Sequence, residues 1–183
     1  MKLDFLVNWS IFYTVIMRRL IVQVNKKVKM RKIKVGRVSY SGRLNQGTIA
    51  KSGIKRREII SELKGTLSKV RTIYSIQVSH KIHLEPIFPG KFLNHSCQPN
   101  SYLKMIKGKV FLIAKETIKN GAHITFDYAT TEYDLVKTIK CQCGKKTCRR
   151  QVCGFKSMSE EWKTSQHNYL IDYLKRISKD NKY

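Results

Sequence analysis

Apolar and polar residues alternate over short distances through most of the chain, a pattern typical of half-buried β-strands. Residues that favour turns separate these segments. Lys107 and Gly108 lie between two of them, Gly121 precedes another, and Pro86 and Pro89 mark a loop. The pattern predicts a mainly β chain, with strands at residues 48–50, 58–63, 73–79, 102–106, 110–115 and 124–126.

After residue 157 the apolar residues change to the spacing of an amphipathic helix. Ser157 or Ser159 is suited to cap its start, and Glu160 and Glu161 are favourable charges for its first turn. The apolar side chains are expected to cover the β core, and they are Trp162, Tyr169, Leu170, Tyr173, Leu174 and Ile177.

Residues 5–17 form an apolar run that is followed by Arg18 and Arg19. The run is too short to span a bilayer, it contains Asn8, and no small-residue cleavage site follows it. We therefore predict neither a signal peptide nor a membrane anchor. Translation from Met17 or Met30 is an alternative start, and residues 1–30 are expected to have little functional content.

Composition adds a strong electrostatic feature to this picture. The 183 residues, 42% of them hydrophobic, are enough for one sizeable core, and we predict one catalytic-size domain. Lys and Arg total 37 against 12 Asp and Glu, so the formal net charge is +25. This charge favours contact with a polyanion, either nucleic acid, a nucleoprotein or an anionic membrane face. Residues 25–37 are predicted to be a lysine-rich connector that is solvated or bound to a polyanion.

The chain has five cysteines, an odd number that disfavours a framework of disulfides. Cys141 and Cys143 are separated by one residue and Cys148 follows closely, whereas Cys97 is isolated upstream. Such close spacing, without a convincing secretory signal, indicates metal ligation in a reducing compartment.

Three motifs together resemble the SET-domain protein-lysine methyltransferases with a post-SET zinc motif. Residues 92–100 read FLNHSCQPN, residues 121–128 read GAHITFDY, and the cysteines at 141, 143 and 148 resemble the post-SET triplet. The resemblance implies small β-sheets with a knot-like crossing of two loops, a post-SET zinc loop and a C-terminal helix. It divides the chain into a basic extension at 1–36, a SET domain at 37–136, a post-SET zinc motif at 137–156 and a helix at 157–183.

The resemblance implies one structural zinc ion, held by the post-SET triplet and one cysteine from the central motif. Four thiolates make a closed tetrahedral site, so this ion is not expected to take part in catalysis. We favour Cys97 as the fourth ligand, with Cys141, Cys143 and Cys148. Cys153 is the competing candidate because it lies near the triplet in sequence, but using it would leave Cys97 without a role.

The resemblance also assigns residues to a pocket for S-adenosylmethionine. Asn94 and His95 would bind this cofactor. Asn45, Gln46 and Gly47 match the family's Gly-x-Gly turn, with Asn45 at a position where asparagine tolerates a positive φ.

Three aromatic residues would form a narrow channel for the target lysine. Tyr128 is the principal catalytic residue, which holds the amine and also contacts the cofactor, while Tyr74 and Phe126 line the channel. A purely structural tyrosine on a β face is the alternative for Tyr74. An in-line transfer needs a neutral amine. No dedicated general base is evident, so water is expected to remove the proton.

These assignments predict an S-adenosylmethionine-dependent protein-lysine N-methyltransferase. Phe126 leaves room in the channel, which favours di- or trimethylation. The substrate would be a histone or another basic nucleoprotein bound as an extended strand. Because a surface at +25 repels a naked lysine-rich tail, a substrate presented on nucleic acid or one with acidic flanks is favoured. The expected location is intracellular and soluble, either in the nucleus on chromatin or in the cytoplasm.

Other functions remain open at this stage. A non-catalytic SET-like module would keep the fold and zinc but bind a basic peptide or nucleic acid. A zinc-bearing DNA-binding protein is disfavoured, because no His pair follows the cysteines at finger spacing. A ribosomal or nucleoid protein is a further candidate target.

Overall fold

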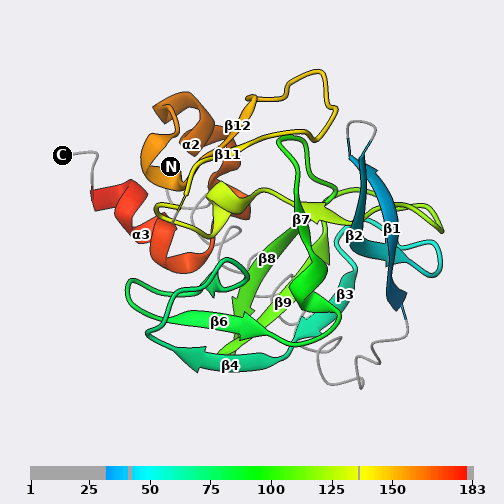
Figure 1. Cartoon of the computed structure of the whole chain (residues 1–183). Coiled ribbons are helices and arrows are strands. Elements are labelled where there is room, and N and C mark those ends of the chain that lie inside the picture. Colours follow the sequence, from blue (N-terminus) through cyan, green and yellow to red (C-terminus); the bar gives the residue numbers. More distant parts are fainter. Residues whose placement is uncertain (1–31, 41–42, 136, 181–183) are drawn as a thin grey trace, which may run out of the picture.

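The computed structural model describes residues 32–40, 43–135 and 137–180. The chain is mainly β, as predicted, and its strands form small sheets instead of one large one. The hairpin of β1 (Ile33–Tyr40) and β2 (Arg43–Ala50) stands on one side of the molecule and the C-terminal helices on the other. Strands β8 (Ser101–Ile106) and β9 (Lys109–Ala114) lie between them (Figure 1). The predictions for residues 1–30 lie outside the described residues.

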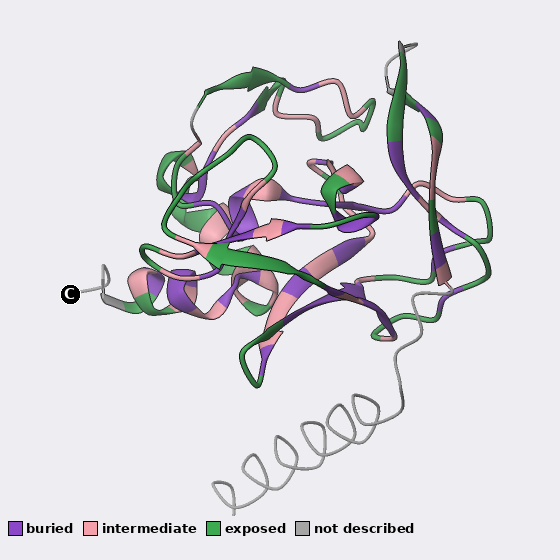
Figure 2. Cartoon of the chain, turned by 60° about the horizontal axis from the view of Figure 1, so that its bottom comes forward, coloured by how far each residue is buried: buried purple, intermediate pink, exposed green. Residues whose placement is uncertain are grey.

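The central sheet has the antiparallel order β3-β9-β8, formed by β3 (Ile59–Leu63), β9 (Lys109–Ala114) and β8 (Ser101–Ile106). Lys107 and Gly108 form the predicted hairpin turn between β8 and β9, with φ of 49° and 74°. Both values suit the two central residues of a tight β-turn that matches strand twist. Figure 2 shows buried residues concentrated along these central strands.

A long hairpin of β1 (Ile33–Tyr40) and β2 (Arg43–Ala50) lies beside this sheet. The prediction of a solvated connector through residue 37 is wrong for residues 33–37, which belong to β1. Ile33 and Val38 are buried, whereas Lys34 and Arg37 are exposed. The cationic side chains thus point to solvent while the backbone pairs with β2, and the predicted boundary at 36/37 falls inside the strand.

The third sheet consists of β4 (Gly65–Ser68), β6 (His83–Pro86) and β5 (Ile76–Gln77) in the order β4-β6-β5. The strand predicted at 73–79 is shorter, because only Ile76 and Gln77 pair in the sheet. Strands β4 and β6 were not predicted. The residues of β4 are mostly exposed, so they lack the apolar alternation that marks a strand in sequence.

The C-terminal segment is divided into α2 (Glu160–Gln166), the 3-10 helix η5 (His167–Tyr169) and α3 (Asp172–Asp180). The prediction of a single helix is therefore wrong, although Ser159 caps α2 by accepting a hydrogen bond from the Trp162 N–H over 3.3 Å. The helix breaks because Leu170 is extended and the Ile171 N–H donates to Thr130 O over 2.9 Å. Both residues are buried, Leu170 as expected for the predicted apolar face and Ile171 although it was not assigned to that face.

The remaining short elements position the candidate site. They are η2 (Gly90–Phe92), β7 (Asn94–His95), β10 (Thr125–Phe126), η3 (Tyr128–Thr130), β11 (Ile139–Lys140), β12 (Gln151–Val152) and η4 (Phe155–Ser157). Within the described ranges, none of the helices has both the length and the apolar character needed to span a bilayer.

Candidate functional site

Strands β7 and β10 bring the two motifs at 92–100 and 121–128 side by side. The strands are parallel, with Asn94 opposite Thr125 and His95 opposite Phe126. The Asn100 side chain joins the same segments, since its Nδ2 donates to His123 O over 2.8 Å and its Oδ1 accepts from the Thr125 N–H over 3.0 Å. Residues that are distant in sequence therefore form one surface.

His95 is buried in this surface and contacts Tyr128. Its Nδ1 accepts a hydrogen bond from the Tyr128 N–H over 3.2 Å, and the two rings pack edge to face with centroids 5.2 Å apart. Burial lowers the pKa of His95 to about 4, and the opposing charge of Asp127 only partly offsets this effect. The imidazole is therefore neutral at pH 7, with its proton on Nε2, which lies 3.3 Å from the Cys97 sulfur.

One cavity, of about 290 Å³, lies between this surface and the segment that carries the cysteine triplet. Of the residues predicted to bind a cofactor, four line this cavity: Asn45, Asn94, His95 and Tyr128. Its other walls come from β11, β12 and the residues next to them, including Gln142 and Val152.

Gln46 and Gly47 support the cavity wall without lining it. The Asn94 Nδ2 donates to Gln46 O over 2.9 Å. A Cβ on Gly47 would lie 2.6 Å from His123 Nε2 and 2.8 Å from Asn94 Nδ2, so a larger residue would force these side chains to shift. Asn45 is paired within β2 and does not need the positive φ considered for it, because the described non-glycine residues with positive φ are Arg57, Lys107 and Arg150.

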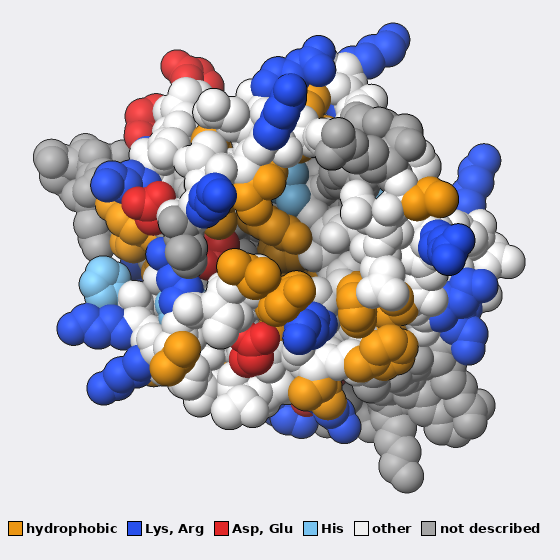
Figure 3. Space-filling view, in the orientation of Figure 1, with side chains coloured by type: hydrophobic (Ala, Val, Ile, Leu, Met, Phe, Trp, Pro, Cys, Tyr) orange, Lys and Arg blue, Asp and Glu red, His pale blue; other side chains and the backbone are white. Residues whose placement is uncertain are grey.

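A second cavity, of about 110 Å³, lies on the other side of Tyr128. Tyr128 and Ile139 line both cavities. The three predicted channel residues all line the second one, with Phe126 buried at 4.9 Å from the Tyr128 ring and Tyr74 about half exposed. Figure 3 shows hydrophobic side chains gathered around a hollow in this face of the molecule.

A backbone hydrogen bond holds the hydroxyl of Tyr128, a residue that lines both cavities. The hydroxyl donates a hydrogen bond to Leu93 O over 2.9 Å. Burial raises the pKa of this hydroxyl, and the charge of Glu132 raises it further, so Tyr128 stays neutral at physiological pH. Its oxygen can accept a hydrogen bond from a group that enters the second cavity.

Glu132 also lines the second cavity, and the sequence analysis missed it. Its Oε1 accepts from the Gln77 N–H over 2.8 Å and from the Thr131 hydroxyl over 3.1 Å. Burial raises the pKa of Glu132 to about 7. No motif covers this residue, and a single acid just after a polar stretch is not distinguishable in sequence from a surface residue.

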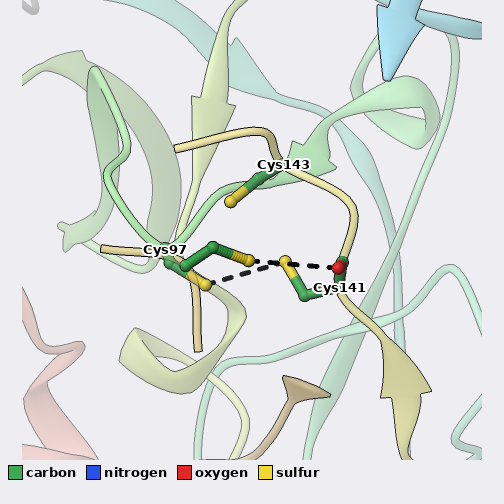
Figure 4. A group of neighbouring side chains, drawn as sticks. Cys97, Cys141 and Cys143 are labelled. Atoms are coloured by element: carbon green, nitrogen blue, oxygen red, sulfur yellow. Dashed lines mark hydrogen bonds between the residues drawn. The ribbon is translucent and has the colours of Figure 1, made fainter. Parts of the chain in front are cut away.

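Four cysteines meet beside the first cavity. The sulfur atoms of Cys97, Cys141, Cys143 and Cys148 all lie within 4.8 Å of one another, and those of Cys97 and Cys141 are 3.6 Å apart. Figure 4 shows the thiols of Cys97, Cys141 and Cys143 gathered in one place. A tetrahedral zinc site with bonds of about 2.3 Å has sulfur atoms about 3.8 Å apart. The group can therefore hold a metal ion, and Cys153 lies outside it.

Comparison with known proteins agrees with this arrangement. The family model described as "SET domain" matches residues 13–129. The Caenorhabditis elegans protein "Histone-lysine N-methyltransferase set-2" is 41% identical over 64 residues, which cover 33% of this chain and 4% of the relative. The Arabidopsis thaliana protein "Histone-lysine N-methyltransferase ASHH3" is 24% identical over 150 residues, which cover 70% of this chain and 41% of the relative. The chain thus spans less than half the length of either relative.

A solved structure has the same fold. The structure described as "KRYPTONITE in complex with mCHG DNA and SAH" aligns with a TM-score of 0.54 and 20% identity over 66% of this chain and 28% of the other. A second structure of KRYPTONITE, which also contains an H3(1-15) peptide, aligns with the same TM-score and 21% identity. The family model covers more than half of the chain, and the fold agrees with it. This protein therefore belongs to the SET domain family.

Proposed function

We propose that this protein is an S-adenosylmethionine-dependent protein-lysine N-methyltransferase. The observation that carries the proposal is that Tyr128 lies on the walls of two cavities, one next to Asn94 and His95, the other mainly aromatic and aliphatic. A group-transfer enzyme needs a donor and an acceptor to meet at one point without water between them. The relatives named as histone-lysine N-methyltransferases support this activity.

The first cavity is the proposed binding site for the methyl donor, through Asn45, Asn94, His95 and Tyr128. The donor supplies an electrophilic methyl group on a sulfonium. Asn94 is oriented by its hydrogen bond to Gln46 O, and neutral His95 adds no positive charge that would repel a cationic donor. The SAH named in the KRYPTONITE structures is consistent with such a site.

The second cavity is the proposed channel for the target lysine. Phe126, Tyr128 and Leu93 make its inner wall largely apolar, which suits the aliphatic part of a lysine side chain. The fixed Tyr128 oxygen positions the amine for in-line attack. Phe126 has no hydroxyl to occupy the channel, so we expect products up to di- or trimethyl-lysine.

We assign one structural zinc ion to Cys97, Cys141, Cys143 and Cys148. Four sulfur ligands leave no open coordination position, so the ion would hold the cysteine segment against the first cavity. Residues of this segment, including Cys141, line that cavity, which links the proposed zinc to donor binding.

The proposed substrate is a lysine-bearing protein of chromatin or another nucleoprotein, which would place the enzyme in the nucleus. The net charge of +25 favours a substrate that is presented on nucleic acid. The KRYPTONITE structures that contain DNA and an H3 peptide support such a partner class.

The test is transfer of labelled methyl groups from S-adenosylmethionine to nucleosomes and to a cell lysate, with mass spectrometry to locate the modified lysine. We expect the wild-type chain to label a lysine and Tyr128→Phe to lower the rate on the order of 100-fold. Tyr102→Phe is the matched control, because Tyr102 packs against Tyr169 outside both cavities. A wild-type chain that binds a lysine peptide or nucleic acid but transfers no label would instead be a non-catalytic binding module.

A further inference from the structure

Glu132 is an acid in an unusual position. It is the only acidic side chain among the described residues that line the 110 Å³ cavity, and it is 6% exposed. Around it the cavity wall is formed by Phe126, Tyr128 and Leu135. A buried carboxylate in such surroundings is unfavourable unless a cation or several hydrogen bonds stabilise it.

Glu132 and Tyr128 line the same cavity and are joined through the backbone. The Glu132 N–H donates to Tyr128 O over 2.8 Å, so the two residues are one turn apart. The two hydrogen bonds from Gln77 and Thr131 both go to Oε1. None of the ion pairs among the described residues includes Glu132. The carboxylate is therefore anchored through one oxygen and has no cationic partner within ion-pair distance.

We propose that Glu132 receives the ammonium group of the target lysine in this cavity and accepts its proton before methyl transfer. This inference rests on the proposed function and assigns a general base that the sequence did not reveal. The incoming cation would satisfy a buried carboxylate that lacks a partner, and the carboxylate would remove the proton that blocks the nitrogen lone pair.

The step is balanced as follows. An N–H bond of the ammonium breaks, its electron pair stays on nitrogen, and the proton forms an O–H bond on the Glu132 carboxylate. The nitrogen lone pair then forms the C–N bond with the methyl of the sulfonium donor, while the electron pair of the S–C bond stays on sulfur. Glu132 later returns the proton to water.

Glu132 has charged and titratable neighbours in and beside this cavity. Arg71, Lys91 and Lys137 line the same cavity, and the charge of Arg71 favours the ionised carboxylate. The phenols of Tyr128 and Tyr173 are close enough for Glu132 to raise the pKa of each. Burial is the largest effect and raises the pKa of Glu132 to about 7, a value suited to a base that works near neutral pH.

A purely structural role is the alternative, in which Glu132 only anchors β5 through the Gln77 N–H. Glu132→Gln separates the two roles, because its amide oxygen can still accept the hydrogen bonds from Gln77 and Thr131. Glu132→Asp retains a carboxyl group at this position. Glu62→Gln is the matched control for the exchange of Glu for Gln, since Glu62 pairs with Lys109 outside both cavities. A cooperative thermal transition and S-adenosylhomocysteine binding equal to that of the wild type would show that each variant is folded.

The first experiment measures kcat/KM against pH with a peptide that the wild-type enzyme methylates. We expect wild-type activity to fall below about pH 7, where Glu132 becomes protonated, and Glu132→Gln to lose about 100-fold at pH 8. Without the carboxylate, the rate should rise about tenfold per pH unit toward the lysine pKa of about 10.4. A substrate with aminoethylcysteine in place of the target lysine, whose amine is less basic, should partly rescue the variant. An unchanged pH profile in Glu132→Gln would overturn the proposal.

The second experiment does not depend on turnover. Binding of n-butylammonium, a mimic of the lysine side chain, is measured by NMR titration at pH 8 and pH 5.5. We expect wild-type binding to weaken about tenfold or more at the lower pH, and Glu132→Gln to bind weakly at both. If the wild-type chain methylates no lysine but shows this binding, the proposed function fails and amine recognition by Glu132 stands. If wild type and Glu132→Gln bind n-butylammonium equally, Glu132 is not the group that receives the amine.

Discussion

Asp127 and Arg149 form a bidentate pair in which the guanidinium donates two hydrogen bonds of 2.7 Å to the two carboxylate oxygens. Asp127 precedes Tyr128 and is 3% exposed, and Arg149 follows the last cysteine of the metal-binding group. The Arg149 N–H also donates to the Cys97 sulfur over 3.4 Å. The pair therefore joins the cysteine segment to both motifs of the candidate active site.

Replacing Arg149 with Met should break this connection. Asp127 would remain buried without its cationic partner, so we expect the free energy of unfolding to fall by about 3 kcal/mol. Urea denaturation of the zinc-saturated protein measures this change. Arg176→Met, on the exposed side of α3, is the control and should have little effect. If Arg149→Met lowers the free energy of unfolding no more than Arg176→Met does, the pair does not stabilise the fold.

Exchanging single cysteines tests the composition of the metal site. We expect the wild-type protein to bind about one zinc ion per chain and Cys97→Ser to lose it, because the group would have only three thiolates. Cys153→Ser should retain the metal, since Cys153 lies outside the group. Metal analysis and thermal unfolding with and without a chelator measure both effects. Metal loss in Cys153→Ser alone would show that the ligand set is wrong.

Gly47 should be intolerant of even one methyl group. In Gly47→Ala the new Cβ would meet Asn94, His123 and a methyl of Val38 at 2.6–2.8 Å, so the wall of the first cavity must shift. We expect S-adenosylhomocysteine affinity, measured by calorimetry, to fall by about 1–3 kcal/mol. Gly53→Ala is the control because a Cβ there meets no atom within 4 Å. Equal affinities for the two variants would argue against Gly47 as support for a donor site.

Phe126 should influence how many methyl groups are added. Phe126→Tyr introduces a hydroxyl into a cavity of about 110 Å³, where it would occupy space and bind a water or the amine. We expect the product to shift toward monomethyl-lysine, as measured by intact mass under excess donor. Phe88→Tyr, at an exposed position, should leave the product distribution unchanged. A wild-type product that stops at monomethyl-lysine would contradict the expectation of di- or trimethylation.

Because Glu132 is buried, the difference in stability between the wild-type protein and Glu132→Gln should depend on pH. Its pKa in the folded state is raised from 4.5 to about 7, so the folded state binds the proton more tightly than the unfolded state does. The wild-type protein should therefore lose stability relative to Glu132→Gln as pH rises from about 4.5 to 7, by about 3 kcal/mol. Urea unfolding of both proteins at pH 5 and pH 8 measures the change. If the free energies of unfolding of the two proteins differ by the same amount at both pH values, the pKa of Glu132 is not raised by burial.

Features that depend on neighbouring residues were predictable from sequence. The turn at Lys107 and Gly108, the cap at Ser159 and the close spacing of Cys141 and Cys143 follow from local geometry. The motifs around His95 and Tyr128 were recognisable because each is a short, specific run of residues. Their combination indicated the SET domain family, which the family model confirms.

Features that depend on contacts between distant segments required the tertiary structure. Strand β1 forms within a lysine-rich stretch because β2 supplies its hydrogen-bond partners, and the C-terminal helix breaks because Thr130 binds the Ile171 N–H. Likewise, only the folded chain encloses Glu132 beside Tyr128 and gives its carboxyl an unusual pKa. Sequence determined which chemical groups are present and their local conformation. Long-range packing decides which of these groups come together, which are buried and how their charges interact. A local sequence pattern does not report the energies of such contacts.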